Sequence, residues 1–164
     1  MVARRSSSLT AHPNTRRVAE ILAAAGAGDA VREFDESTRT AKDAAAALAC
    51  PVGAIASSLV FMADGEPLLI VTSGAHRVDT DLVAAALGVT ELRQAKPDEV
   101  RAATGFPIGG VAPVGHPRPV RTLVDAHLRE YDVLWAAAGT PRAVFSTTFD
   151  ELVRLTGAEE VTVA

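Results

Sequence analysis

One long loop of the sequence has the composition to stabilise negative charge with its main chain. From Thr104 to Pro117 it is rich in glycine and proline. Gly109 and Gly110 allow the backbone to approach a ligand closely and to adopt positive φ angles, and Pro113 stiffens the far end. Consecutive backbone N–H groups in such a loop can face an oxygen that becomes negative during a reaction. On composition alone a structural turn is the simpler interpretation, and the absence of a following Gly-Lys-Ser/Thr excludes a P-loop.

Two further segments carry hydroxyl groups where a pocket could form. The apolar run that ends in Gly139 and Thr140 is a strand followed by a glycine turn, an arrangement that often lines a pocket. Ser57 and Ser58 precede another apolar run. A serine nucleophile needs a neighbouring base, and no Gly-x-Ser-x-Gly elbow surrounds this pair. Taken singly, both segments are better interpreted as ordinary strand ends.

Four residues of metal-ligand type occur close to these segments. They are His76, Asp79, Asp81 and His116. Asp79 and Asp81 are better explained as the cap and first turn of a helix, where carboxylates complement the helix dipole. The two histidines lie in separate loops without an established metal spacing. We therefore expect no metal and no cofactor.

The composition of the chain limits the classes of function. With 164 residues, nearly half of them apolar, one domain with a sizeable core is expected. A net charge of −4 disfavours a general duplex binder, although a local patch could still hold one RNA end. A single cysteine, Cys50, allows no internal disulfide, and no apolar run is long enough for a bilayer. We expect a disordered tail over residues 1–11, a single domain over 12–164, no membrane contact and a cytoplasmic protein.

The elements that must position these residues follow from hydrophobic periodicity and turn signals. Residues 14–25 predict a helix capped by Asn14 or Thr15, and residues 40–49 a helix capped by Thr40. Asp64-Gly65 between two apolar runs is a strong hairpin signal, with strands over 58–63 and 67–72 buried on both faces. Further helices are expected at 79–88, 97–103 and 149–155, and further strands at 31–35, 91–95, 122–124, 133–138, 143–146 and 161–163. Short strands mixed with separate helices indicate an α+β fold.

The segments also fall in a recognisable order. The sequence contains Ser57-Ser-Leu-Val-Phe61, Arg77-Val-Asp79, Gly109-Gly-Val-x-Pro-x-Gly115, Ala138-Gly-x-Pro-x-Ala-Val-Phe145, Asp150-Glu-Leu and Leu155-Thr-Gly. This order resembles the YbaK/ProX family, which also occurs as the editing insertion of bacterial prolyl-tRNA synthetases. The resemblance covers about residues 12 to 164, and the ordered set is more specific than any single motif.

The resemblance implies a mixed, barrel-like sheet flanked by helices and hydrolysis of the ester that joins a wrong amino acid to tRNA. Such editing is needed because small side chains differ too little in binding energy for one pocket to separate them. Backbone amides of the loop would stabilise the oxyanion without a metal or a covalent intermediate. The site residues implied are Gly109, Gly110 and Ser57 for catalysis, and Val111, Pro113, Gly139, Thr140 and Arg77 for substrate binding.

This sequence departs from the family pattern at two of those positions. Many relatives carry a lysine where Ser57 stands, and some carry a histidine where Thr140 stands. A hydroxyl does not replace an ammonium charge, so three alternatives are open: another cation such as Arg77 serves, the substrate differs, or the activity is weak or lost. Two functions remain open. One is a deacylase acting in trans on the 3′ end of mischarged tRNA; the other is a non-catalytic protein that binds an aminoacyl-tRNA end, a nucleotide or an aminoacyl-tRNA synthetase. Either would be a monomer or a homodimer.

Overall fold

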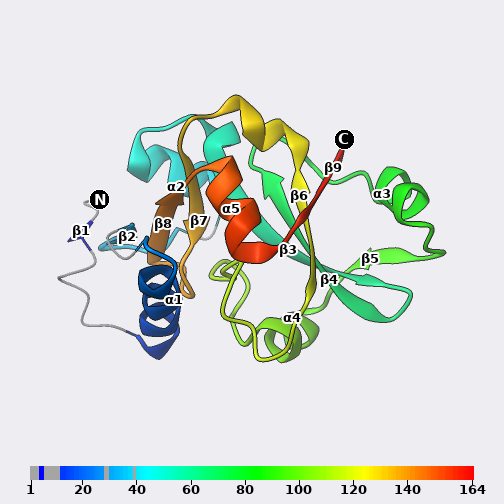
Figure 1. Cartoon of the computed structure of the whole chain (residues 1–164), viewed down its shortest axis with the longest axis horizontal. Helices are drawn as coiled ribbons and strands as arrows, with labels where there is room; N and C mark the ends of the chain where they lie inside the picture. The colour runs from blue at the N-terminus through cyan, green and yellow to red at the C-terminus, as the bar shows by residue number, and fades with distance from the viewer. Residues whose placement is uncertain (1–3, 6–11, 28–29, 39) are drawn as a thin grey trace.

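The protein folds around one mixed β-sheet, as seen in a computed structural model that describes residues 4–5, 12–27, 30–38 and 40–164 (Figure 1). The sheet of this described part has nine strands in the order β1-β2-β8-β7-β3-β4-β6-β9, with β5 paired to β3 outside that path. The strands are β1 (Arg4–Arg5), β2 (Val31–Glu33), β3 (Ile55–Ala63), β4 (Glu66–Ser73), β5 (Leu92–Gln94), β6 (Arg121–Asp125), β7 (Leu134–Ala137), β8 (Ala143–Thr147) and β9 (Glu159–Val161). Three pairs are parallel, β3 with β7, β4 with β6 and β6 with β9, which confirms the predicted mixed α+β fold.

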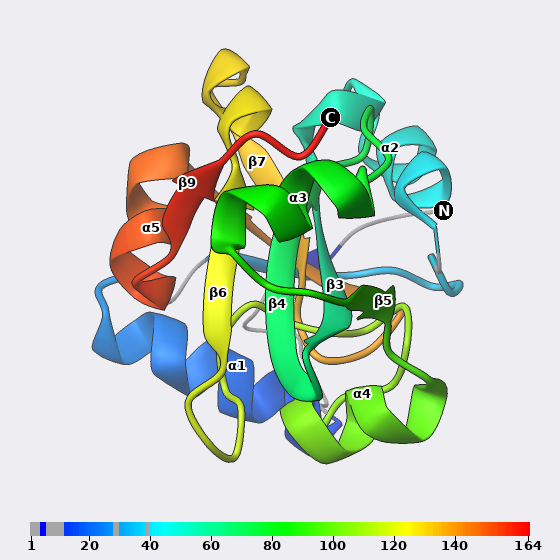
Figure 2. The same ribbon diagram turned by 90° about the vertical axis from the view of Figure 1, so that its right-hand side faces the viewer.

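Five helices and two 3₁₀ turns of the described chain surround this sheet. They are α1 (Pro13–Ala24), α2 (Ala41–Leu48), α3 (Thr80–Leu87), α4 (Pro97–Thr104), α5 (Phe149–Thr156), η2 (Val52–Ala54) and η3 (Ala126–Glu130). Figure 2 shows α3 across the near side of β4, with α1 on the far side of the sheet. None of the helices described is of the length and apolarity that a bilayer crossing requires.

The β3–β4 hairpin is the centre of the sheet. Its strands pair from Ala56 with Ser73 to Ala63 with Glu66, and the turn is the predicted Asp64-Gly65 with φ angles of 48° and 84°. The predicted burial on both faces is confirmed for β4, which is buried from Leu68 onward. In β3, residues 57–59 are only half-buried. The departure in β3 occurs where the sheet leaves a cavity, described below.

The two faces of the hairpin contact different cores. Ala56 and Val60 of β3 belong to the larger core, which includes Val18 of α1 and Leu152 of α5. Phe61 faces the smaller core beneath α3, where Leu68, Ile70, Val83 and Val163 also pack. Because side chains alternate along a strand, this division fixes the register of β3.

Most helix and strand ends lie within two residues of the predicted ones, but β3 begins at Ile55, three residues before the predicted start. Thr40 accepts a hydrogen bond from Asp43 N at 3.0 Å and caps α2 as predicted. The cap predicted for α1 was wrong, because Pro13 starts the helix and His12 Nδ1 accepts from Asn14 N at 3.1 Å. The last strand lies at Glu159–Val161, two residues earlier than predicted, because these residues pair with β6.

The predicted tail, residues 1–11, lies largely outside the described residues. Within it, Arg4 pairs with Glu33 and Arg5 with Arg32, so that β1 extends the sheet beyond β2. The boundary between tail and domain stays a prediction.

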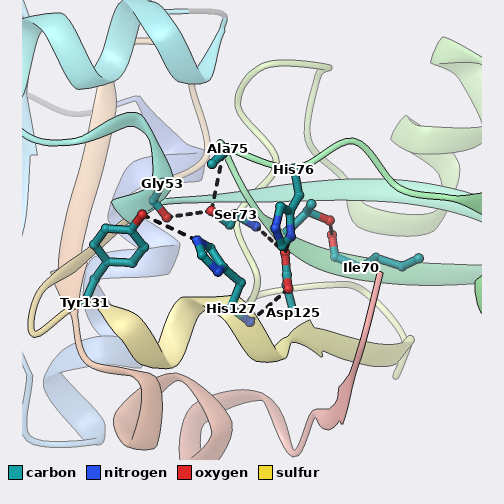
Figure 3. A network of polar contacts seen from close by, with 9 residues as sticks. Gly53, Ile70, Ser73, Ala75, His76, Asp125, His127 and Tyr131 are labelled. Carbon is teal, nitrogen blue, oxygen red and sulfur yellow. Dashed lines mark hydrogen bonds and ion pairs between the residues drawn. The ribbon is translucent and has the colours of Figure 1, made fainter. Parts of the chain in front are cut away.

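A buried carboxylate joins the ends of neighbouring elements through a network of polar contacts (Figure 3). Asp125, at the end of β6, is 1% exposed. Its Oδ2 accepts from Ser73 N at 3.0 Å and lies 2.9 Å from His76 Nδ1, and its Oδ1 accepts from His127 N at 3.0 Å. Ser73 Oγ in turn donates to Gly53 O at 2.7 Å. The ends of β4 and β6 are thereby fixed to η2 and η3.

We expect Asp125→Asn to destabilise the fold by about 1–3 kcal/mol, because one of the buried N–H donors loses its acceptor. The free energy of unfolding in urea would measure this loss. Asp132→Asn, an exposed carboxylate seven residues later, is the control and should change stability by less than about 0.5 kcal/mol. Equal stability of the two variants would show that the Asp125 contacts do not support the fold.

Candidate functional site

The sheet is open along part of one edge of β3. β4 pairs with β3 along one side, while β7 pairs only with Ile55 and Ala56 on the other side. β5 takes up that second side again from Phe61 to Ala63. In the described chain no strand pairs with residues 57–59 on this edge. The interruption leaves room for a ligand between the ends of β7 and β5.

A cavity of about 370 Å³ lies at this opening. Three chain segments far apart in sequence meet β3 there: the start of α2, the glycine-rich loop after α4, and the turn between β7 and β8. The wall consists of Thr38, Thr40, Ala41, Ala44, Ile55–Val60, Gln94, Ala95, Val100, Ile108, Gly109, Val111, Trp135–Ala137, Thr140, Ala143 and Val144. It is mostly small and apolar, and none of these wall residues carries an ionisable side chain.

Four of the predicted site residues line this cavity. Ser57 comes from β3, Gly109 and Val111 from the glycine-rich loop, and Thr140 from the turn after β7. Three segments separated by up to 83 positions are thus brought to one pocket, as the resemblance implies for a shared site. Whether these four residues act in catalysis or binding stays a prediction.

The other predicted residues stand behind or away from the wall. Gly110 is buried against the turn that holds Thr140: a Cβ there would lie 2.7 Å from Thr140 Cα. Gly139, with φ of 98°, packs against α1, where Asn14 Nδ2 donates to its carbonyl oxygen at 3.1 Å. Pro113 is buried within the loop.

Arg77 does not line the cavity. It is exposed in the segment between β4 and α3, two residues before the Asp79 cap of α3. As a replacement for the family lysine it would therefore have to contact a part of the substrate that lies outside the cavity.

The amides of the glycine-rich loop are not equally available. Gly110 N donates to Pro107 O at 3.0 Å, so this N–H is already used in a turn. Among the described residues, the amides of Gly109 and Val111 have no acceptor. A catalytic role of Gly110 stays a prediction, while Gly109 and Val111 are among the loop residues of the wall whose amides donate to no described acceptor.

Side-chain contacts from α1 and from the loop itself hold this segment in place. His116 Nε2 lies 2.9 Å from Ala112 O, one residue beyond Val111, and its ring meets Phe106 edge-on at 6.2 Å. The Arg17 guanidinium covers the same Phe106 ring at 5.2 Å. Burial lowers the pKa of the His116 imidazole, and the nearby Arg17 charge adds to this effect. His116 is thus a support of the loop.

Several wall residues gave no signal in the sequence. Thr38 is buried and donates through Oγ1 to Pro141 O at 3.0 Å, which joins the segment before α2 to the β7–β8 turn. Ala41 and Ala44 of α2 reach the wall only because α2 packs beside Ile55. The sequence around Ala41 and Ala44 predicts a helix but does not indicate that the helix lines a cavity. In the part of the chain that the structure describes, no group of three or more acidic, histidine or cysteine side chains could hold a metal.

The fold and the matched sequence define the class of protein. The family model of the aminoacyl-tRNA editing domain matches residues 35–155, which include β3, the glycine-rich loop and the β7–β8 turn. The chain therefore belongs to the aminoacyl-tRNA editing domain family.

The chain is also similar to individual proteins and solved structures. A crystal structure described as a candidate trans-editing enzyme for prolyl-tRNA synthetase superposes with a TM-score of 0.87 at 45% identity, covering 94% of this chain and 98% of that one. The uncharacterised protein YwhH of Bacillus subtilis is 31% identical over 74% of this chain and 78% of its own length. The proline–tRNA ligase of Leuconostoc citreum is 35% identical over 62% of this chain, which spans only 17% of that ligase.

Gly110→Ala should destabilise the protein by about 3 kcal/mol, because the added methyl group meets backbone atoms of Thr140 that cannot move independently. Gly157→Ala is the matched control: its Cβ would meet open space, and only the positive φ of 66° costs about 1 kcal/mol. Chemical denaturation of both variants gives the comparison. If the two losses were the same, the close approach of the loop to the Thr140 turn would be wrong.

The lowered pKa of His116 predicts a loss of stability in mild acid. The unfolded chain binds this proton near the ordinary value of 6.5, while the folded protein binds it only at lower pH. The contribution is therefore complete above pH 6.5 and decreases as the pH falls through the lowered pKa. Unfolding free energies at pH 7.5, 6.5 and 5.5 should decrease more steeply for the wild type than for His116→Gln. Parallel pH dependences in the two proteins would contradict this assignment.

Proposed function

We propose that this protein is an aminoacyl-tRNA deacylase that acts in trans and hydrolyses the ester bond of mischarged tRNA. The observation that carries the proposal is the opening in the β3 edge, where two loop residues whose amides have no described acceptor, Gly109 and Val111, line a cavity of about 370 Å³. Membership of the editing-domain family and the similarity to the candidate trans-editing enzyme support the same activity. The aminoacyl ester at the 3′ end of the tRNA would enter this cavity.

In the proposed reaction, water attacks the ester carbonyl carbon and the carbonyl oxygen becomes negative. The N–H groups of Gly109 and Val111 stabilise that oxygen, as donors fixed before the reaction stabilise oxyanions in general. The carbon–oxygen bond to the ribose then breaks, the ribose oxygen takes a proton, and the free amino acid leaves as its carboxylic acid. No ionisable side chain lines the described wall, so the substrate itself supplies the base that accepts the proton of the attacking water.

The wall also favours small, uncharged side chains as substrates. Alanine, valine, serine and threonine make up most of it, and a charged amino-acid side chain would lose its hydration there without a partner. Small apolar amino acids are those that synthetases separate least well by binding alone. Because relatives include proline–tRNA ligases, we propose tRNA mischarged by prolyl-tRNA synthetase as the first substrate to test, with that synthetase as a partner and the cytoplasm as the compartment.

One observation favours a second function. Ser57 stands where many relatives have lysine, and the described wall offers no cation in its place. A protein with this wall could bind an aminoacyl-tRNA end, or a synthetase, without catalysing hydrolysis. This alternative predicts binding of aminoacyl-tRNA without turnover, whereas the deacylase proposal predicts both.

Purified protein should deacylate tRNA(Pro) charged with a small wrong amino acid faster than buffer alone, in an assay that follows the loss of labelled amino acid from tRNA. Gly109→Ala should reduce the rate about 100-fold, because repacking of its left-handed backbone misplaces the loop donors. Gly88→Ala is the matched control, since Gly88 has a similar φ of 71° at the end of α3, with no atom within 4 Å of an added Cβ.

The two functions give different results in this experiment. Absence of hydrolysis across a panel of amino acids, together with retained binding of the same charged tRNAs, would reject the deacylase and support the binding protein. If Gly109→Ala hydrolyses the ester at the wild-type rate, the amides of this loop do not stabilise the oxyanion.

A further inference from the structure

Ser58 is unusual among the residues of the cavity wall. Its Oγ has no hydrogen-bond partner and is shielded from solvent, although the residue itself lines the cavity. Thr15 Oγ1 is the one other buried side-chain polar atom of the described residues without a partner. Leaving a buried hydroxyl unpaired is unfavourable, and each such group in a native protein calls for an explanation, such as a catalytic role or a bound water or ion. A serine hydroxyl can also rotate about χ1 among three staggered positions, so it can turn toward the cavity.

The main chain of Ser58 is directed into the same opening. Gly74 N donates to Ile55 O at 2.8 Å on the β4 side, and Ala95 N donates to Val60 O at 3.0 Å on the opposite side. Because main-chain groups alternate along a strand, the carbonyl of Ser58 points with that of Val60, away from β4. No strand of the described chain pairs with Ser58 on that edge. Its carbonyl oxygen is thus an acceptor at the gap.

The chemistry of the wall determines which ligand group suits these two oxygens. An aminoacyl ester carries an α-ammonium group with three N–H donors next to the ester carbonyl. The described wall offers no carboxylate to this cation, so neutral oxygen acceptors must replace its water. Gly109 and Val111 provide donors for the ester oxygen, and Ser58 provides acceptors from the strand edge.

We propose that Ser58 anchors the α-amino group of the aminoacyl ester through its main-chain carbonyl and its hydroxyl. Ser58 is then a binding residue that positions the ester carbonyl for the loop amides. The inference rests on the proposed function, because it takes an aminoacyl ester as the ligand. It differs from the role expected of Ser57, whose side chain lies on the opposite face of β3, with those of Ile55 and Leu59.

The test measures binding of a non-hydrolysable probe, 3′-alanylamino-3′-deoxyadenosine, and of its N-acetyl derivative by calorimetry. Acetylation removes the positive charge and two of the three N–H donors while leaving the rest of the probe unchanged. The wild type should bind the free amine about tenfold more tightly than the acetylated probe, because hydrogen bonds to a charged group are the stronger kind.

Two variants of equal shape isolate the hydroxyl. Ser58→Thr keeps it and should keep the preference for the free amine, whereas Ser58→Val lacks it and should lose most of that preference. Thr15→Val removes the other unpartnered hydroxyl, in α1 and outside the wall, and should bind both probes as the wild type does. Circular dichroism and thermal unfolding establish that each variant is folded.

Several results would overturn the anchor. They are equal affinity of the wild type for the two probes, an unchanged preference in Ser58→Val, and no binding of either probe. The deacylation assay with real esters separates this outcome from the proposed function. Binding with the expected preference but no ester hydrolysis would reject the deacylase and support the role of Ser58 in binding the α-amino group. Hydrolysis without any preference for the free amine would support the deacylase and reject that role of Ser58.

Discussion

The site depends on a single constraint, the unequal pairing of the two edges of β3. β4 pairs with one edge from Ala56 to Ala63, which holds the strand in register. On the other edge, pairing with β7 ends at Ala56 and pairing with β5 begins only at Phe61. The residues of β3 between these two points therefore have a strand neighbour on the β4 side alone. A rigid strand with unpaired main-chain groups can exist inside a protein only where another polar partner or a cavity replaces the missing strand. Here the cavity does so, and the glycine-rich loop closes it.

The loop can close the cavity because two close approaches fix it. Gly110 contacts the backbone of Thr140 at a distance that leaves no room for a side chain, and Gly139 makes a similar approach to Asn14 of α1. The contacts of Phe106 with Arg17 and His116 then hold the rest of the loop from behind. The loop amides are thus positioned by packing and by main-chain contacts rather than by charged side chains, which agrees with a wall that has no ionisable group among the residues described.

The sequence predicted the local elements well and the long-range contacts poorly. The Asp64-Gly65 turn, the Thr40 cap and the glycine-rich loop carry their signals within a few residues, because turn and cap preferences are local. Ser57, Gly109, Val111 and Thr140 were placed together by resemblance, and the cavity brings them together. No local pattern could show that Gly110 packs against the backbone of Thr140, or that the segment before α2 reaches the wall. Likewise, Asp125 could not be foreseen as a buried acceptor, because its donors come from segments up to 52 residues away.

A wall without ionisable groups restricts how any chemistry here can work. In the proposed hydrolysis the described wall supplies no base, so rate enhancement would come from holding the ester in one orientation and from dipoles that meet the developing negative oxygen. Orientation requires that both ends of the small aminoacyl group be held, since one contact leaves it free to rotate. The loop offers donors on one side, and the open edge of β3 offers acceptors on the other. The resemblance implies a lysine at position 57, and the serine found there fits the proposed arrangement if the terminal nucleotide is held outside the cavity, where Arg77 is exposed.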